Sequence, residues 1–226
     1  MKRKICILLC LLILILLIAA CSSKNGKVRA SSVGSVQKGE NYSDIIVQSP
    51  MTLSNNDLFS IIGKPQYLRI KMVRGKYYED WNPGAYMGTL WEGYYTVELA
   101  DEFGNTIAGT ELSEMYDEPL IFNSTFQLQF DDYNNDGDID FTIGQYASSN
   151  GKNYKLFTLR EDGKIEELKV KDRPSLFISD TTYSTKLIRP DAVTFKTEHY
   201  DNSKGKNIEE VFIWDGEQFV QDESLS

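Results

Sequence analysis

Residues 131–141 carry oxygen-bearing side chains at alternate positions, in the spacing of a calcium-binding loop. Counted from Asp132 as the first place, the first, third, fifth, seventh and ninth places hold Asp132, Asn134, Asp136, Asp138 and Asp140. Gly137, at the sixth place, permits a sharp backbone turn. The seventh place ordinarily contributes its main-chain carbonyl. Alternate side chains converge as such a loop curls, so the spacing predicts a Ca²⁺ site.

Charge repulsion in this segment favours the same interpretation. Five carboxylates lie between Asp131 and Asp140, and without a cation they repel one another in a tight turn. A hard divalent ion with several oxygen ligands relieves this repulsion, and calcium tolerates irregular geometry best. The alternative is a solvated acidic turn that binds no ion, because Asp, Asn and Gly are common in turns.

The residues on either side distinguish this loop from an EF-hand. The twelfth place holds Ile143, where an EF-hand has a bidentate glutamate. The flanking segments 126–130 and 139–145 alternate between apolar and polar residues, which is typical of strands and not of helices. The sequence therefore predicts a calcium loop that joins two strands.

The loop and the following strand resemble those of FG-GAP/VCBS repeats, the units of integrin-type propeller blades. The matching loop residues are Asp132, Asn134, Asp136 and Asp140, and the matching strand residues are Ile139, Phe141 and Ile143. The resemblance covers at best residues 120–220, in which 212–219 resemble the closing hairpin of such a unit. It implies one blade-like unit packed on another β-layer. Since the loop occurs once and a propeller needs typically about 4–8 blades, no closed propeller is expected.

The N-terminus has the order of a secretory signal: basic residues, an apolar run over residues 5–20, and small residues before Cys21. Ile18-Ala19-Ala20-Cys21 resembles the bacterial lipobox. That resemblance implies removal of a signal peptide over residues 1–20 and a lipid on Cys21, palmitate included. The product would be a lipoprotein anchored to the cell membrane and facing outside the cytoplasm. The alternative is an uncleaved signal anchor with an incidental cysteine.

Composition limits the chemistry of the processed chain. Its other two cysteines, Cys6 and Cys10, would leave with the signal peptide, which excludes disulfides, thiol catalysis and cysteine-based zinc sites. The full chain has net charge −9; without Lys2, Arg3 and Lys4 the balance is 21 basic to 33 acidic side chains, or −12. A surface this acidic repels nucleic acid.

The remaining chain is predicted to be mainly β, with antiparallel sheets that are blade-like or sandwich-like. A flexible tether over 21–43, rich in Ser, Gly, Lys and Asn, precedes a β-rich domain over 44–226; a division of that domain into 44–118 and 119–226 is left open. Strands are predicted in 67–73, 94–99, 120–130, 139–145, 154–159, 165–170, 193–196 and 211–214. Asp-Gly pairs predict hairpin turns at 160–164 and 214–218.

One short helix is predicted near the start of the domain. Ser54 or Asn55 could cap it, with Asp57 in the first turn. Its apolar face would comprise Leu58, Phe59, Ile61 and Ile62. Gly63-Lys64-Pro65 would end it.

No motif in the sequence identifies a catalytic site. The single histidine, His199, is not preceded by a Gly-x-Ser-x-Gly motif, and neither a phosphate loop nor a His-Glu-x-x-His zinc motif occurs. Glu79-Asp80-Trp81 could bind sugar, but packing by Trp81 is the favoured interpretation. The leading hypothesis is therefore a non-catalytic, calcium-stabilised module that binds an envelope protein, a cell-wall component or a glycan. The alternatives are an extracellular hydrolase that uses Trp81 and Trp91, and a lipoprotein that assists a neighbouring membrane system.

Overall fold

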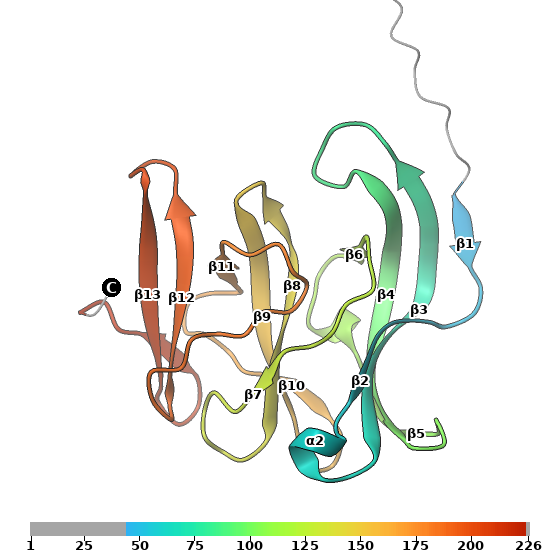
Figure 1. The fold of residues 1–226 in the computed structure, drawn as a ribbon, viewed down its shortest axis with the longest axis horizontal. Coiled ribbons are helices and arrows are strands. Elements are labelled where there is room, and N and C mark those ends of the chain that lie inside the picture. Colours follow the sequence, from blue (N-terminus) through green and yellow to red (C-terminus); the bar gives the residue numbers. More distant parts are fainter. Residues whose placement is uncertain (1–43, 225–226) are drawn as a thin grey trace, which may run out of the picture. The chain divides into compact units, whose positions relative to one another are not determined.

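The computed structural model describes residues 44–224, which form three antiparallel β-sheets and one short α-helix (Figure 1). This confirms the predicted fold class, which is mainly β with a short helix near the start, and these residues form no closed propeller. The predicted signal peptide, Cys21 and the tether lie outside the described residues. Within residues 44–224, no helix has the length and apolar character needed to cross a membrane.

The first sheet is built on one long antiparallel hairpin. Its strands are β1 (Ile45–Val47), β2 (Met51–Asp57), β3 (Gln66–Asp80), β4 (Gly88–Asp101), β5 (Thr106–Glu111) and β6 (Leu120–Phe122). β3 pairs with β4 along its length, β1 and β2 pair with β3, and β5 and β6 pair with β4. A 3₁₀ turn, η1 (Leu112–Glu114), follows β5. Because β6 lies in this sheet, the sheet takes strands from both sides of residue 118.

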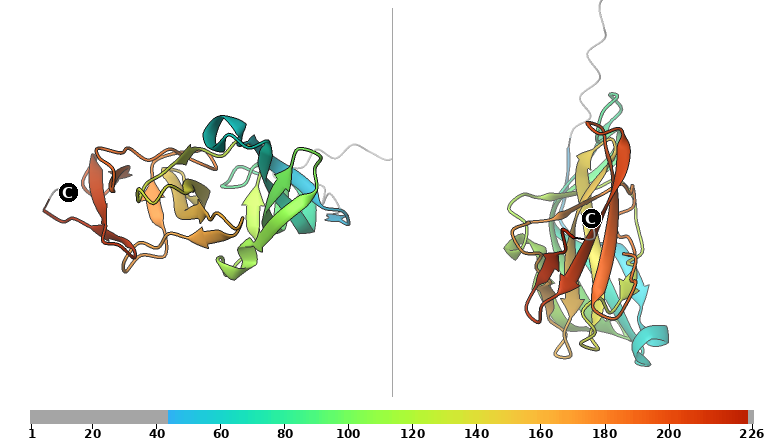
Figure 2. Two further views of the ribbon diagram at one scale, coloured as in Figure 1. Left: turned by 90° about the horizontal axis from the view of Figure 1, so that it is seen from below. Right: turned by 90° about the vertical axis from the view of Figure 1, so that its left-hand side faces the viewer.

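The second and third sheets follow along the chain. The second contains β7 (Phe130–Asp131), β8 (Ile139–Ser148), β9 (Gly151–Leu159), β10 (Ile165–Glu167) and β11 (Leu176–Ile178). The third contains β12 (Thr194–Asp201), β13 (Lys206–Trp214) and β14 (Phe219–Gln221). The second sheet stands between the other two (Figure 1 and Figure 2). Both predicted hairpins are confirmed, with β9 pairing with β10 and β13 with β14.

The middle sheet contributes to a core on each of its faces. Phe141 and Phe157 lie opposite each other across β8 and β9 and belong to the core shared with the first sheet. Leu156 on β9 belongs to a second core, which it shares with Phe195 of the third sheet. Since neighbouring residues of a strand point to opposite faces, β8 and β9 are buried on both sides. All six residues from Ile139 to Gly144 are buried, including the polar residues Asp140 and Thr142.

The short helix exists, but the predictions of its start and its apolar face were wrong. α2 spans Phe59–Ile62 and follows β2, so Ser54 and Asn55 lie in a strand. No side chain caps it; the Asp57 carboxylate instead accepts the N–H of Phe59 at 2.8 Å. Leu58 is buried, whereas Phe59 and Ile61 are exposed. Strand pairing with β3 outweighs the local capping signal, because it satisfies several main-chain groups at once. Gly63 ends the helix in the left-handed conformation, as predicted.

The strand predicted over 120–130 was also partly wrong. Only Leu120–Phe122 and Phe130 lie in strands. Between them the main chain bonds to other groups: the N–H of Leu128 donates to the side chain of Asn56 at 2.8 Å, and that of Gln129 to Ser184 at 3.0 Å. Leu128 is still buried between exposed neighbours. The alternation therefore reports which side chains face the core, and it does not require a strand partner.

Candidate metal centre

The acidic loop connects β7 to β8 at one end of the middle sheet (Figure 1). Phe130 pairs with Phe141 and Asp131 with Asp140, which closes the base of the loop. The loop therefore joins two strands, as the sequence predicts. β7 is only two residues long, so strand pairing fixes only the base of the loop.

Side-chain oxygens at the first, third and fifth places turn inward and accept main-chain N–H groups. Both oxygens of Asp132 are engaged, by the N–H of Asp136 at 3.2 Å and of Gly137 at 3.1 Å. Asn134 accepts the N–H of Asp136 at 3.3 Å, and Asp136 accepts that of Asp138 at 2.9 Å. Gly137 has a φ of 90°, which fits the turn predicted for the sixth place.

Asp140 is the most unusual residue of the loop because its carboxylate is fully buried. Oδ2 accepts the N–H of Tyr133 at 2.7 Å, but Oδ1 has no hydrogen-bond partner within the described residues. The pKa of Asp140 is raised to about 7, chiefly by burial and also by the carboxylates of Asp136 and Asp132. The N–H of Tyr133 and the nearby Thr158 hydroxyl act to lower it. A buried carboxylate with a free oxygen is costly unless a proton or a cation neutralises it.

A positive charge that the sequence analysis missed lies beside the loop. Nη1 of Arg160 is 2.7 Å from Oδ2 of Asp136 and 3.0 Å from Oδ2 of Asp138, and its Nε is 2.7 Å from Glu166. Arg160 begins the β9–β10 turn, immediately after Leu159, which pairs with Ile139 at the end of the loop. That register could have identified Arg160 as a neighbour of Asp138. The guanidinium balances part of the negative charge at the loop.

Asp131 belongs to a different ion pair. Its carboxylate binds Arg189 through Oδ1 and Lys186 through Oδ2, the latter at 3.0 Å. Burial acts to raise its pKa, but the N–H of Asp132 and these two basic side chains hold the pKa below its usual range. Asp131 is therefore already neutralised, and it is not counted among the ligand candidates.

The loop offers oxygen ligands, the type that calcium prefers. In the structure these oxygens do not converge on one point. Asp132, Asn134, Asp136 and Asp140 supply oxygen atoms only, and calcium takes six to eight oxygen ligands. The side chain of Asp138 is directed to Arg160, which leaves its carbonyl for the seventh place. No three acidic, histidine or cysteine side chains of residues 44–224 converge closely enough to hold a metal. Binding would require the carboxylates to leave Arg160 and the main-chain N–H groups.

The other residues singled out from sequence lie in different elements: His199 on β12, Trp91 on β4 and Trp81 in the β3–β4 connection. Nδ1 of His199 lies 3.9 Å from Glu210, whose carboxylate binds Arg173 through both oxygens at 2.9 and 3.0 Å. Trp91 packs against the first core. Trp81 is exposed and its indole N–H donates to Glu79 at 2.9 Å, so the prediction that it packs a loop was wrong.

Comparison with protein-family models, with curated proteins and with solved structures yields no match. The assignment of this site therefore depends on the spacing, burial and charge of its own residues.

Proposed function

We propose that this protein is a membrane-anchored extracytoplasmic lipoprotein whose β-domain is stabilised by Ca²⁺ and acts as a non-catalytic binding module. Its partner would be an envelope protein, a cell-wall component or a glycan. The observation that carries the calcium assignment is the buried carboxylate of Asp140, which accepts one regular hydrogen bond, from the N–H of Tyr133, and lies at the base of a loop with oxygen ligands. An acidic turn formed only by solvated side chains offers no reason to bury that carboxylate.

Calcium would act on the loop through charge. Arg160 compensates Asp136 and Asp138 but makes no hydrogen bond with Asp140. A divalent ion bound by Asp132, Asn134, Asp136 and Asp140 would neutralise the buried carboxylate directly and displace Arg160 from Asp136. Calcium sites of extracellular modules are weak or moderate, with dissociation constants of about 10⁻⁴–10⁻³ M. A site of that affinity suits a protein outside the cytoplasm.

The expected result for the calcium assignment is a higher unfolding temperature in CaCl₂ than in EGTA. A ligand that binds only the folded state at a hundredfold excess over its dissociation constant adds about 2.7 kcal/mol, which for a domain of this size is about 5–10 °C. Circular dichroism of the full-length protein in mild detergent measures the shift. Asp136→Ala should lose the response.

Asp215→Ala is the matched control. Asp215 also accepts main-chain N–H groups in an acidic turn, at 2.9 Å from Glu217 and Gln218, but it lies in the β13–β14 hairpin. This variant should keep the calcium response of the wild type. An identical midpoint in CaCl₂ and EGTA for the wild-type protein would contradict the assignment.

The anchor proposal predicts that Cys21→Ser removes the lipid and shifts the protein out of the membrane fraction. The reason is that only a thiol at the lipobox cysteine can carry the thioether-linked lipid. Incorporation of labelled palmitate, followed by cell fractionation, measures both effects. Cys10→Ser, within the apolar run of the predicted signal peptide, is the control and should behave as wild type. Labelling of Cys21→Ser at the wild-type level would refute the anchor.

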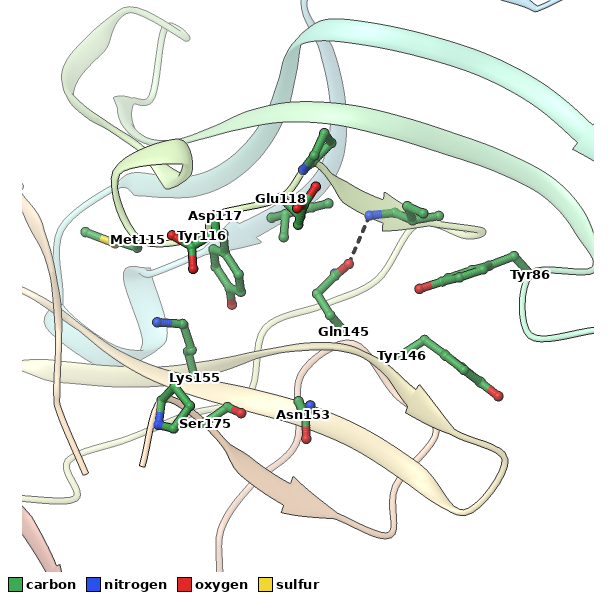
Figure 3. Close-up of a pocket in the computed structure, with 14 residues that line it drawn as sticks. Tyr86, Met115, Tyr116, Asp117, Glu118, Gln145, Tyr146, Asn153, Lys155 and Ser175 are labelled. Atoms are coloured by element: carbon green, nitrogen blue, oxygen red, sulfur yellow. Dashed lines mark hydrogen bonds between the residues drawn. The ribbon is translucent and has the colours of Figure 1, made fainter. Parts of the chain in front are cut away.

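The alternative function, an extracellular hydrolase of a glycan or cell-wall polymer, needs two facing carboxylates. Among the lining residues of the pocket shown in Figure 3, the only two that carry carboxylates are Asp117 and Glu118. They are consecutive in the chain and lie on the same side of the pocket. This arrangement favours binding over hydrolysis at that pocket.

A further inference from the structure

A cavity of about 420 Å³ lies between the segment that follows η1 and the strands β8 and β9 of the middle sheet (Figure 3). One side is formed by residues 115–121, and the other by Gln145, Tyr146, Asn153 and Lys155. Tyr86, from the β3–β4 connection, closes one end beside Tyr146. The volume falls within the range of small-molecule pockets, about 300–1,000 Å³.

Aromatic rings line the cavity and are held in place. The rings of Tyr86 and Tyr146 have their centroids 5.2 Å apart and are inclined at 55°. Tyr116 is fixed at its far end, because its hydroxyl donates to the carbonyl of Ile143 at 3.2 Å. These rings present apolar surfaces that need no reorganisation to receive a flat, partly apolar ligand.

The polar groups of the cavity are of two kinds. Gln145 and Lys155 are structural: the amide of Gln145 accepts the N–H of Ile121 at 2.9 Å, and Lys155 binds both oxygens of Glu167 at 3.0 Å. A second group makes no hydrogen bond to any other residue in the range 44–224. It comprises the hydroxyls of Tyr86, Tyr146 and Ser175, the carboxamide of Asn153, and the carboxylates of Asp117 and Glu118. Several donors and acceptors thus remain available to a ligand.

The charge of the cavity disfavours anions. The positive charge of Lys155 is balanced by Glu167 at 3.0 Å. Asp117 and Glu118 then leave the lining negative, so a phosphate or carboxylate ligand would meet repulsion. Neutral ligands and ligands that carry an amine meet no such penalty.

The main-chain edges at the cavity do not suit an added peptide strand. Asn153 on β9 is paired on both sides, with Gln145 of β8 and Phe177 of β11. On β6, Ile121 pairs with Glu92, and its N–H is already taken by the side chain of Gln145. A peptide that binds by strand addition needs a free edge, and here it would have to displace Gln145.

We propose that this cavity binds a short glycan of one or two sugar units, neutral or amine-bearing. The C–H faces of sugar rings pack on aromatic rings, while their hydroxyls pair with groups such as the Asn153 carboxamide and the Ser175 hydroxyl. This inference names the ligand class of the proposed binding module and therefore rests on that function. The aromatic surface and the unused polar groups together carry it, because a sugar can use both, whereas an apolar ligand would use only the rings.

Titration of the full-length protein with defined sugars in mild detergent and CaCl₂ tests the proposal. The probes are cellobiose, N,N′-diacetylchitobiose, the chitosan disaccharide and digalacturonate, with the tripeptide Ala-Lys-Ala as a peptide probe. Isothermal titration calorimetry should give saturable binding of at least one neutral or amine-bearing disaccharide. Digalacturonate should bind at least about tenfold more weakly, which corresponds to ~1.4 kcal/mol.

Variants locate the binding in the cavity. Tyr146→Ala should weaken the best disaccharide at least about tenfold, because it removes one of the two paired rings. Tyr200→Ala, an exposed tyrosine on β12 outside the cavity lining, should bind as wild type. A wild-type calcium shift in both variants shows that they are folded.

Three results would overturn the glycan assignment: no disaccharide saturates, only the tripeptide binds, or Tyr146→Ala binds the disaccharide as Tyr200→Ala does. If the calcium shift of the wild type persists in that case, only the glycan assignment fails. Loss of the calcium shift with sugar binding intact would instead refute the calcium-stabilised module.

Discussion

Asp140→Asn is expected to stabilise the calcium-free protein at pH 8 and to abolish its response to calcium. At that pH the wild-type residue is a buried carboxylate with one unpaired oxygen. Asparagine keeps an oxygen for the N–H of Tyr133 and adds an N–H₂ group next to Thr158, whose hydroxyl has no hydrogen-bond partner within the described residues. It carries no charge, so it neither requires a counterion nor binds calcium strongly.

The size and sign of this effect follow from the pKa. Burial raises the pKa of Asp140 from 3.8 to about 7 in the folded, calcium-free protein. The folded state therefore holds a proton that the unfolded chain releases, and stability falls as pH rises from about 4 to about 7. The loss is at most about 4 kcal/mol, because three pKa units at ~1.36 kcal/mol each set the limit. Above pH 7 the loss is constant.

Urea unfolding in EGTA at pH 4.5, 6 and 8 measures this effect. The free energy of unfolding of Asp140→Asn minus that of wild type should increase over this series. Carboxylates far from the loop contribute equally to both proteins, so the difference reports Asp140 together with its coupling to Asp132 and Asp136. Asp162→Asn, at an aspartate of the β9–β10 turn that bonds to Lys164, should show no such increase. A difference between Asp140→Asn and wild type that does not change with pH would contradict the prediction.

Local patterns were sufficient to locate the loop and most strands. The alternation of 139–145 and 154–159 reflects the two-residue period of a strand, and both segments are strands in the structure. Asp162-Gly163 indicated a hairpin because glycine adopts the left-handed conformation that such a turn requires, and Gly163 has a φ of 86°. These signals lie within a few residues of one another, so they do not depend on the tertiary structure.

The features that were missed depend on contacts between distant segments. Arg160 reaches Asp136 only because β8 and β9 pair in one register. Tyr86, in the β3–β4 connection, meets Tyr146 of β8, although 60 residues separate them in the sequence. Asp140 lies on the face of β8 opposite to that of Phe141 and accepts the N–H of Tyr133, whose ring is buried in the second core. None of these contacts leaves a pattern in a short window of sequence.

The side chain of Tyr133 joins the acidic loop to the third sheet. Tyr133 lies between the ligand candidates Asp132 and Asn134, and it is fully buried in the second core. Its hydroxyl accepts the N–H of Leu187 at 2.9 Å, and its ring meets that of Phe195 edge-on, with centroids 6.0 Å apart. The conformation of the loop is therefore coupled to the packing of β12, and changes in that packing should alter calcium binding.

Phe195→Ala is accordingly expected to destabilise the protein by about 3–5 kcal/mol, the usual cost of removing a buried phenylalanine. Phe195 is fully buried and packs on Phe212 and Phe219, at centroid distances of 5.1 and 4.6 Å. Urea unfolding in CaCl₂ measures the loss. Phe103→Ala is the control: this side chain is 82% exposed in the β4–β5 turn, and its removal should change stability by less than about 0.5 kcal/mol.

The same variant tests the coupling between the second core and the loop. Without the Phe195 ring, Tyr133 loses its edge-on partner, and Asp132 and Asn134 are held less firmly in the conformation that can bind calcium. The calcium dissociation constant of Phe195→Ala should therefore increase, while that of Phe103→Ala stays at the wild-type value. Calorimetric titration well below the unfolding temperature measures both constants. Equal calcium affinity in the two variants would show that the loop is held by β8 and its own hydrogen bonds, independently of the third sheet.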